Sequence, residues 1–112
     1  MLILFDQGTP KGITRALSGH TVITTYERGW DRLHNGALLD VAAAMAVDVL
    51  LTTDQRIRYQ QNLAGRTIAL VVLTGTTRWT QVRLSLDRIA AAVNAALPGS
   101  YTEVAIPFPE NC

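Results

Sequence analysis

Two apolar segments that each end in an aspartate decide the fold: LILFD at residues 2–6 and VLLTTD at residues 49–54. Consecutive apolar residues, as opposed to alternating ones, are typical of strands buried on both faces of a parallel sheet. The aspartates that close the two runs, Asp6 and Asp54, would then lie at the carboxyl ends of their strands. We therefore expect a parallel sheet that carries both carboxylates at one edge.

Helical and strand patterns alternate along the rest of the chain. The predicted order is a strand at 2–5, a helix after Pro10, a strand at 20–25, a helix at 35–47, a strand at 48–53, a helix at 55–63, a strand at 68–73, a helix at 82–97 and an edge strand at 101–106. Thr9 is expected to cap the first helix, with Pro10 at its first position. This alternation predicts a small three-layer α/β/α domain with a mostly parallel sheet of four or five strands. The domain would span residues 1–106, followed by a tail at 107–112.

Composition excludes several classes of protein. The chain has 112 residues, enough for one domain, and ten Lys+Arg against nine Asp+Glu leave a net charge of +1. That balance argues neither for nor against a nucleic-acid partner. The single cysteine, Cys112, rules out a disulfide or a thiolate metal site within one chain. Without a signal peptide or a membrane-length apolar run, the sequence predicts a cytoplasmic protein with no membrane partner.

The two strand-end aspartates are the first candidates for a functional site. In doubly wound sheets, ligands bind outside the carboxyl ends of the strands, near the point where strand order reverses. Two carboxylates from adjacent strands suit Mg²⁺ or Mn²⁺, which prefer oxygen ligands. The competing interpretation is that Asp54 caps the helix that follows it. It applies less well to Asp6, because Thr9 already offers a cap.

Other polar side chains are expected to lie at the same edge. Glu27 and Asp31 follow the second strand and could complete the site, although either could be a solvated loop charge. Asn35 falls on the core-facing side of its predicted helix, at the start. It has two interpretations, as a residue of the site or as the N-cap of the helix. Arg56 and Arg58 follow Asp54, where they could bind a phosphodiester or form a solvated helix face.

Two further aspartates are expected to lie away from the site. Asp48 begins a strand and should therefore lie at the opposite edge of the sheet. Asp40 should point to solvent, because it falls off the apolar face of its helix. Trp30 has two interpretations, as a platform for a nucleic-acid base or as a cover for the core, and the sequence favours the core.

Several segments resemble the PIN-like proteins of the domain-of-unknown-function 5615 type. They are LILFDQGTPKGITRAL at 2–17, GHTVITT at 19–25, VLLTTDQ at 49–55, ERGWDRLHNGALLDVAA at 27–43 and QQNLAG at 60–65. The resemblance implies a PIN-like fold, Mg²⁺ or Mn²⁺ held by acidic residues, and cleavage of RNA by metal-activated water. It also implies a toxin-like role beside a cognate antitoxin protein.

Individual residues match the pattern of that family to different degrees. Asp6 and Asp54 match its metal-binding acids, and Glu27 lies at a typical position as a third catalytic acid. Gln61 also lies at a typical position, which implies contact with substrate. Asn35 stands where many relatives carry aspartate, so the sequence has two matched acids where PIN domains have three or four.

Three functions from different classes remain open at this stage. The first is a metal-dependent ribonuclease, and the second is a PIN-like module that binds a protein or nucleic-acid partner without catalysis. The third is a receiver-like phosphoacceptor domain, since Asp54 follows the third strand and Thr74 the fourth. A receiver needs an acidic pair after its first strand and a lysine after its fifth, whereas Asp6 stands alone and Lys11 is the single lysine. A homodimer is a further alternative for the assembly.

Overall fold

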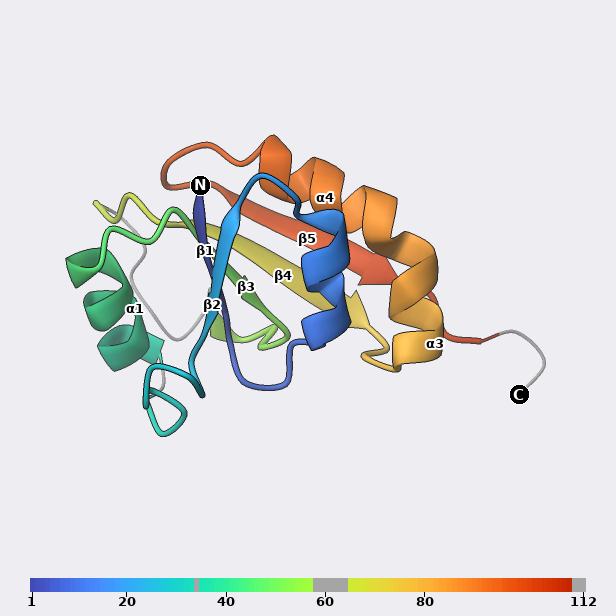
Figure 1. The fold of residues 1–112 in the computed structure, drawn as a ribbon, viewed down its shortest axis with the longest axis horizontal. Helices are drawn as coiled ribbons and strands as arrows, with labels where there is room; N and C mark the ends of the chain where they lie inside the picture. Colours follow the sequence, from blue (N-terminus) through green and yellow to red (C-terminus); the bar gives the residue numbers. More distant parts are fainter. Residues whose placement is uncertain (34, 58–64, 110–112) are drawn as a thin grey trace.

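A five-stranded parallel sheet forms the centre of the protein in a computed structural model (Figure 1). The structure describes residues 1–33, 35–57 and 65–109. The strands are β1 (Leu2–Phe5), β2 (Thr21–Thr24), β3 (Val49–Thr52), β4 (Ala69–Gly75) and β5 (Tyr101–Ile106). The helical elements are η1 (Lys11–Ala16), α1 (Asn35–Ala44), α3 (Trp79–Val82), η2 (Arg83–Ser85) and α4 (Leu86–Asn94).

The strand order is β2-β1-β3-β4-β5, and every neighbouring pair is parallel. From β1 the chain moves outward to β2 and then returns to place β3 on the other side of β1. The order therefore reverses between β1 and β3, as it does in flavodoxin-like doubly wound sheets, which bind ligands at that point. Phe5 is in register with Leu51, so the next residues, Asp6 and Thr52, lie side by side at the carboxyl edge.

Two hydrophobic cores lie on opposite faces of this sheet. Side chains from α1, with Leu38, Leu39 and Ala42, pack on one face. The elements η1, α3, η2 and α4 cover the other face, with residues such as Ile13, Val82, Ile89 and Val93. Consecutive residues of the central strands point into alternate cores, as Leu50 and Leu51 do. This explains why those strands have uninterrupted apolar sequences and confirms the predicted α/β fold class.

The first and last helical segments differ from the sequence predictions. The segment after Pro10 is a short 3₁₀ helix, and Thr9 does not cap it, because the Thr9 hydroxyl donates to the carbonyl of Leu51 at 3.1 Å. The predicted helix at 82–97 begins earlier, at Trp79, and is interrupted by the 3₁₀ turn η2. Residues 58–63 of the predicted helix at 55–63, and residues 110–112 of the predicted tail, lie outside the described residues.

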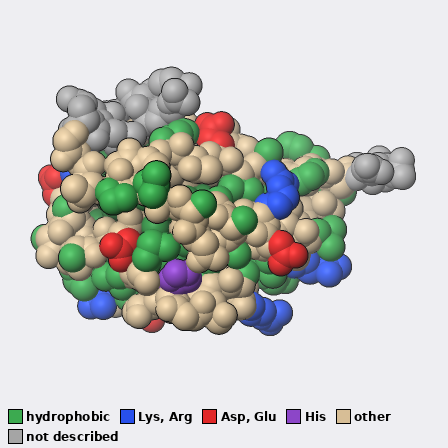
Figure 2. Space-filling model, turned by 90° about the horizontal axis from the view of Figure 1, so that it is seen from above, with side chains coloured by type: hydrophobic (Ala, Val, Ile, Leu, Met, Phe, Trp, Pro, Cys, Tyr) green, Lys and Arg blue, Asp and Glu red, His purple; other side chains and the backbone are tan. Residues whose placement is uncertain are grey.

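Charged side chains are dispersed on one face of the molecule. On the face seen in Figure 2, acidic and basic side chains are scattered among apolar ones and form no continuous patch of one sign. Any nucleic-acid contact on this face would therefore depend on a few local cations instead of a broad basic stripe. Across the part of the chain that the structure describes, no helix has the length and hydrophobicity needed to cross a membrane.

Candidate functional site

Asp6 is held at the carboxyl end of β1 by contacts with the backbone and with the neighbouring strand. Its backbone N–H donates to the carbonyl of Leu51 at 2.9 Å, which continues the ladder between β1 and β3. Its carboxylate accepts two hydrogen bonds, from the N–H of Gln7 to Oδ1 at 2.8 Å and from the hydroxyl of Thr52 to Oδ2 at 2.8 Å. Because these bonds fix the carboxylate at the switch point and leave further lone pairs on both oxygens, Asp6 can still accept another ligand.

Asp54 follows β3 and its side chain makes a local turn. Oδ1 of Asp54 accepts the N–H of Arg56 at 3.0 Å, and the Asp54 carbonyl accepts the N–H of Ile57 at 3.4 Å. In this turn the side chain of Asp54 accepts the N–H of the residue two positions on. The helix predicted at 55–63, which Asp54 was expected to cap, lies largely outside the described residues. Oδ2 of Asp54 has no hydrogen-bond partner among the described residues, so part of this carboxylate remains available to a ligand.

Thr52, which was not among the residues predicted for the site, links the side chain of Asp6 to the backbone of Asp54. Its hydroxyl donates to Oδ2 of Asp6 and accepts the N–H of Asp54 at 3.1 Å, although Asp6 and Thr52 are 46 residues apart. The Thr52 side chain is fully buried, with 0 % exposure. The signal that could have revealed it is the register of the two apolar runs, because aligning Phe5 with Leu51 places Asp6 opposite Thr52.

Gly8 shapes the loop that follows β1, which lies against Thr53 at the end of β3. Gly8 has a φ of +89°, and a Cβ atom at this position would lie 3.4 Å from Oγ1 of Thr53. A residue with a side chain would be strained at that φ angle. Gly8 therefore keeps the loop at residues 6–9 folded against the end of β3, beside Asp6 and Thr52.

The other predicted acidic residues lie near β2. Glu27 is exposed, and its Oε1 accepts the hydroxyl of Thr24 at 2.9 Å while its N–H donates back to that hydroxyl at 3.1 Å. Glu27 therefore has a structural contact within its own turn. Asp31 is half-buried and lines a cavity together with Asp6. Within the described residues, no three His, Cys, Asp or Glu side chains are grouped closely enough to hold a metal ion.

A cavity of about 180 Å³ opens at the carboxyl ends of β1 and β2, next to Asp6. Its lining includes the two loops that follow these strands, with Asp6, Gly8, Lys11, Thr24, Tyr26 and Asp31. Lys11 and Tyr26 were not predicted as site residues. Tyr26 lies in the turn that follows β2, and Lys11 begins the helix after the loop that follows β1, so position after a strand end was the signal that the sequence offered.

The remaining predicted site residues have different outcomes. Arg56 is exposed beside Asp54, where its side chain is accessible to an anion. Asn35 is the first residue of α1, which begins on the carboxyl side of the sheet because it follows β2. Arg58 and Gln61 lie outside the described residues. Trp30 packs against the α1 core, as the core interpretation predicted.

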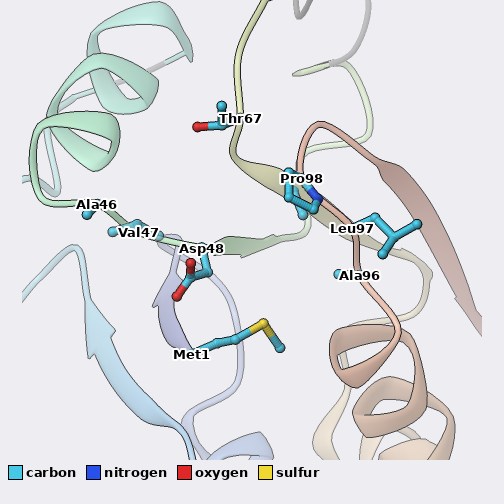
Figure 3. Close-up of a pocket in the computed structure, with 9 residues that line it drawn as sticks. Met1, Ala46, Val47, Asp48, Thr67, Ala96, Leu97 and Pro98 are labelled. Carbon is cyan, nitrogen blue, oxygen red and sulfur yellow. The ribbon is translucent and has the colours of Figure 1, made fainter.

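A second cavity, of about 230 Å³, lies at the opposite edge of the sheet (Figure 3). Met1, Ala46, Leu97 and Pro98 contribute apolar walls, and Asp48 is its acidic residue. Oδ2 of Asp48 accepts the backbone N–H of Leu2 at 2.7 Å. Asp48 therefore supports the start of β1, which confirms its predicted place away from Asp6 and Asp54.

Comparison of the chain with protein-family models, with curated proteins and with solved structures gave no match. The class that the fold defines is thus a small doubly wound α/β domain, with a polar strand-end site at the switch point.

Proposed function

We propose that this protein is a metal-dependent ribonuclease whose site lies at the switch point between β1 and β3. The observation that carries the proposal is the arrangement Asp6–Thr52–Asp54, in which one buried hydroxyl donates to the Asp6 carboxylate and accepts the backbone N–H of Asp54. The resemblance to PIN-like toxin proteins supports RNA as the substrate and an antitoxin protein as a partner. Fold alone does not support this choice, because doubly wound sheets serve many functions.

The donor atoms at the site suit a divalent cation. Mg²⁺ is commonly bound by one or two carboxylates, with water and substrate phosphate filling its remaining positions. Asp6 and Asp54 supply carboxylate oxygens of this kind, so they fit such an ion without a third acid. A bound Mg²⁺ or Mn²⁺ would neutralise charge on a phosphodiester and lower the pKa of a water molecule.

The residues of the chain have separate tasks in this proposal. Thr52 orients the Asp6 carboxylate, and the turn from Asp54 to Arg56 fixes the second carboxylate. Arg56, next to Asp54, and Lys11, which lines the cavity beside Asp6, are exposed cations and would bind phosphate oxygens. Glu27 keeps the turn after β2 in place through Thr24.

Two alternatives have some support. A binding module without catalysis is favoured by the lack of a group of three acids among the described residues. A receiver-like domain is favoured by the strand order, which that fold shares. However, β1 is followed by one acidic residue, Asp6, and β5 is followed by Pro107 and Phe108 where a receiver would need a lysine.

The test compares wild type with Asp6→Asn and Asp48→Asn. Asparagine at position 6 retains an acceptor for the Gln7 N–H but loses the second oxygen, which accepts the Thr52 hydroxyl, so the free energy of unfolding should fall by about 1.5–3 kcal/mol. At a Mn²⁺ concentration ten times Kd, wild type should gain about 1.4 kcal/mol of stability by mass action. Asp6→Asn should lose this gain and lose Mn²⁺-dependent cleavage of RNA.

Asp48→Asn is the matched control. Asp48 also accepts a backbone N–H, but it lies at the opposite edge of the sheet. This variant should therefore retain both the Mn²⁺-induced rise in melting temperature and the cleavage. If wild type shows neither effect at millimolar Mn²⁺, the nuclease proposal is wrong and the binding module replaces it.

A further inference from the structure

The cavity beside Asp6 contains polar groups other than the carboxylates that would hold the metal. Lys11, Thr24, Tyr26 and Asp31 line it, and its volume of about 180 Å³ far exceeds the 10–15 Å³ that one water needs. It borders the metal site through Asp6. A substrate whose phosphate lies at the switch point could therefore place a neighbouring group in this cavity.

The charges around the cavity do not pair with one another. Within residues 1–33, 35–57 and 65–109, neither Lys11 nor Asp31 has an ion-pair partner, although both line the same space. A ligand with an anionic group and separate hydrogen-bond donors would satisfy both residues. A nucleotide has this combination, because its phosphate is an anion and its base edge carries N–H donors.

Tyr26 gives the cavity an aromatic group at its mouth. The residue is 80 % exposed, which is unusual for a large aromatic side chain. The turn that carries it is held by backbone hydrogen bonds, from Gly29 N–H to the Tyr26 carbonyl at 3.1 Å and from Trp30 N–H to the Thr25 carbonyl at 2.8 Å. Tyr26 is therefore presented on a fixed turn, as a stacking platform for a flat ring.

We propose that this cavity binds one unpaired base of a single-stranded RNA, stacked on Tyr26. Asp31 accepts N–H donors from the base, and Lys11 contacts an adjacent phosphate. A base within a duplex cannot bind in this way, because its faces are stacked and its Watson–Crick edge is occupied. Guanine is the preferred base, since its Watson–Crick edge presents two adjacent donors to a carboxylate.

This inference rests on the proposed function for the identity of the substrate, but it is tested without metal. Short fluorescent single-stranded RNAs, with or without one guanine, are titrated in EDTA and followed by anisotropy. Tyr26→Ala should weaken binding by about 5-fold to 150-fold, as expected for the loss of one base–aromatic stack. Tyr26→Phe should bind like wild type, and Asp31→Asn should reduce the preference for guanine.

Phe108→Ala is the matched control, because Phe108 is also an exposed aromatic residue, at 68 %, but follows β5. This variant should bind RNA like wild type. Unchanged affinity in Tyr26→Ala, equal affinity for duplex RNA, or no binding by wild type would each overturn the inference.

Cleavage separates this inference from the proposed function. RNA binding that depends on Tyr26 in a protein that does not cleave would support the inference and refute the nuclease. Mn²⁺-dependent cleavage that needs Asp6, with KM unchanged in Tyr26→Ala, would support the nuclease and refute the inference.

Discussion

Replacing Thr52 by valine tests the contact that holds the candidate site together. Valine has nearly the same shape, so it leaves no cavity but removes the hydroxyl that donates to Asp6 and accepts from Asp54 N–H. A hydrogen bond to a charged group contributes about 1.5–3 kcal/mol, and a neutral one about 0.5–1.5 kcal/mol. Asp6 is half-buried, so water can replace part of the contact that it loses. We therefore expect Thr52→Val to lower the free energy of unfolding by about 2 kcal/mol.

Urea denaturation of Thr52→Val and Thr52→Ser gives the measurement and its control. Serine keeps the hydroxyl and removes one buried methyl group, which costs about 1 kcal/mol. The valine variant should therefore be the less stable of the two. If Thr52→Val is as stable as wild type, or more stable than Thr52→Ser, the hydroxyl does not link the aspartates as we have argued.

Three further substitutions test other contacts. Gly12→Ala should lower the free energy of unfolding by about 1–3 kcal/mol, because the new Cβ would overlap Cη2 of Trp79 and lie 2.6 Å from its Cζ2. Differential scanning calorimetry measures this loss, and a gain of stability would contradict the packing. Asp40→Ala should change the free energy of unfolding, measured in urea, by less than about 0.5 kcal/mol, since Asp40 is 72 % exposed and its ion pair with Arg66 lies on the surface. A larger loss would show that this ion pair stabilises the fold. Arg88 Nη1 donates at 2.8 Å to the Ala105 carbonyl on the free edge of β5, where it blocks pairing with a strand of another molecule. Arg88→Ala should therefore promote self-association, measured by sedimentation velocity, and a strictly monomeric variant would disprove this role.

Much of the sheet could be predicted from local patterns. The runs before Asp6 and Asp54 indicated buried parallel strands, and both form the centre of the sheet. The phase of Asp40 relative to Leu39 was also sufficient to place it on the surface. These predictions succeeded because burial on both faces of a strand, or on one face of a helix, directly determines residue periodicity.

The contacts within the site could not be predicted in the same way. Thr9 is a residue type that commonly caps helices, yet its hydroxyl donates to the carbonyl of Leu51, a residue 42 positions away. Thr52 and Asp6 are likewise brought together by strand register. Long-range partners of this kind depend on which strands are neighbours, and the alternation of helices and strands does not specify that order.

The negative charge of Asp54 is the strongest argument that this edge does more than support the fold. The donor that contacts its side chain is the Arg56 N–H. An asparagine oxygen could accept that hydrogen bond, and asparagine caps helices about as well as aspartate. At position 6, by contrast, the Gln7 N–H and the Thr52 hydroxyl contact different oxygens, so hydrogen bonding alone explains a carboxylate there. It does not explain a second carboxylate at position 54, and a bound cation is the simplest reason for both to be present.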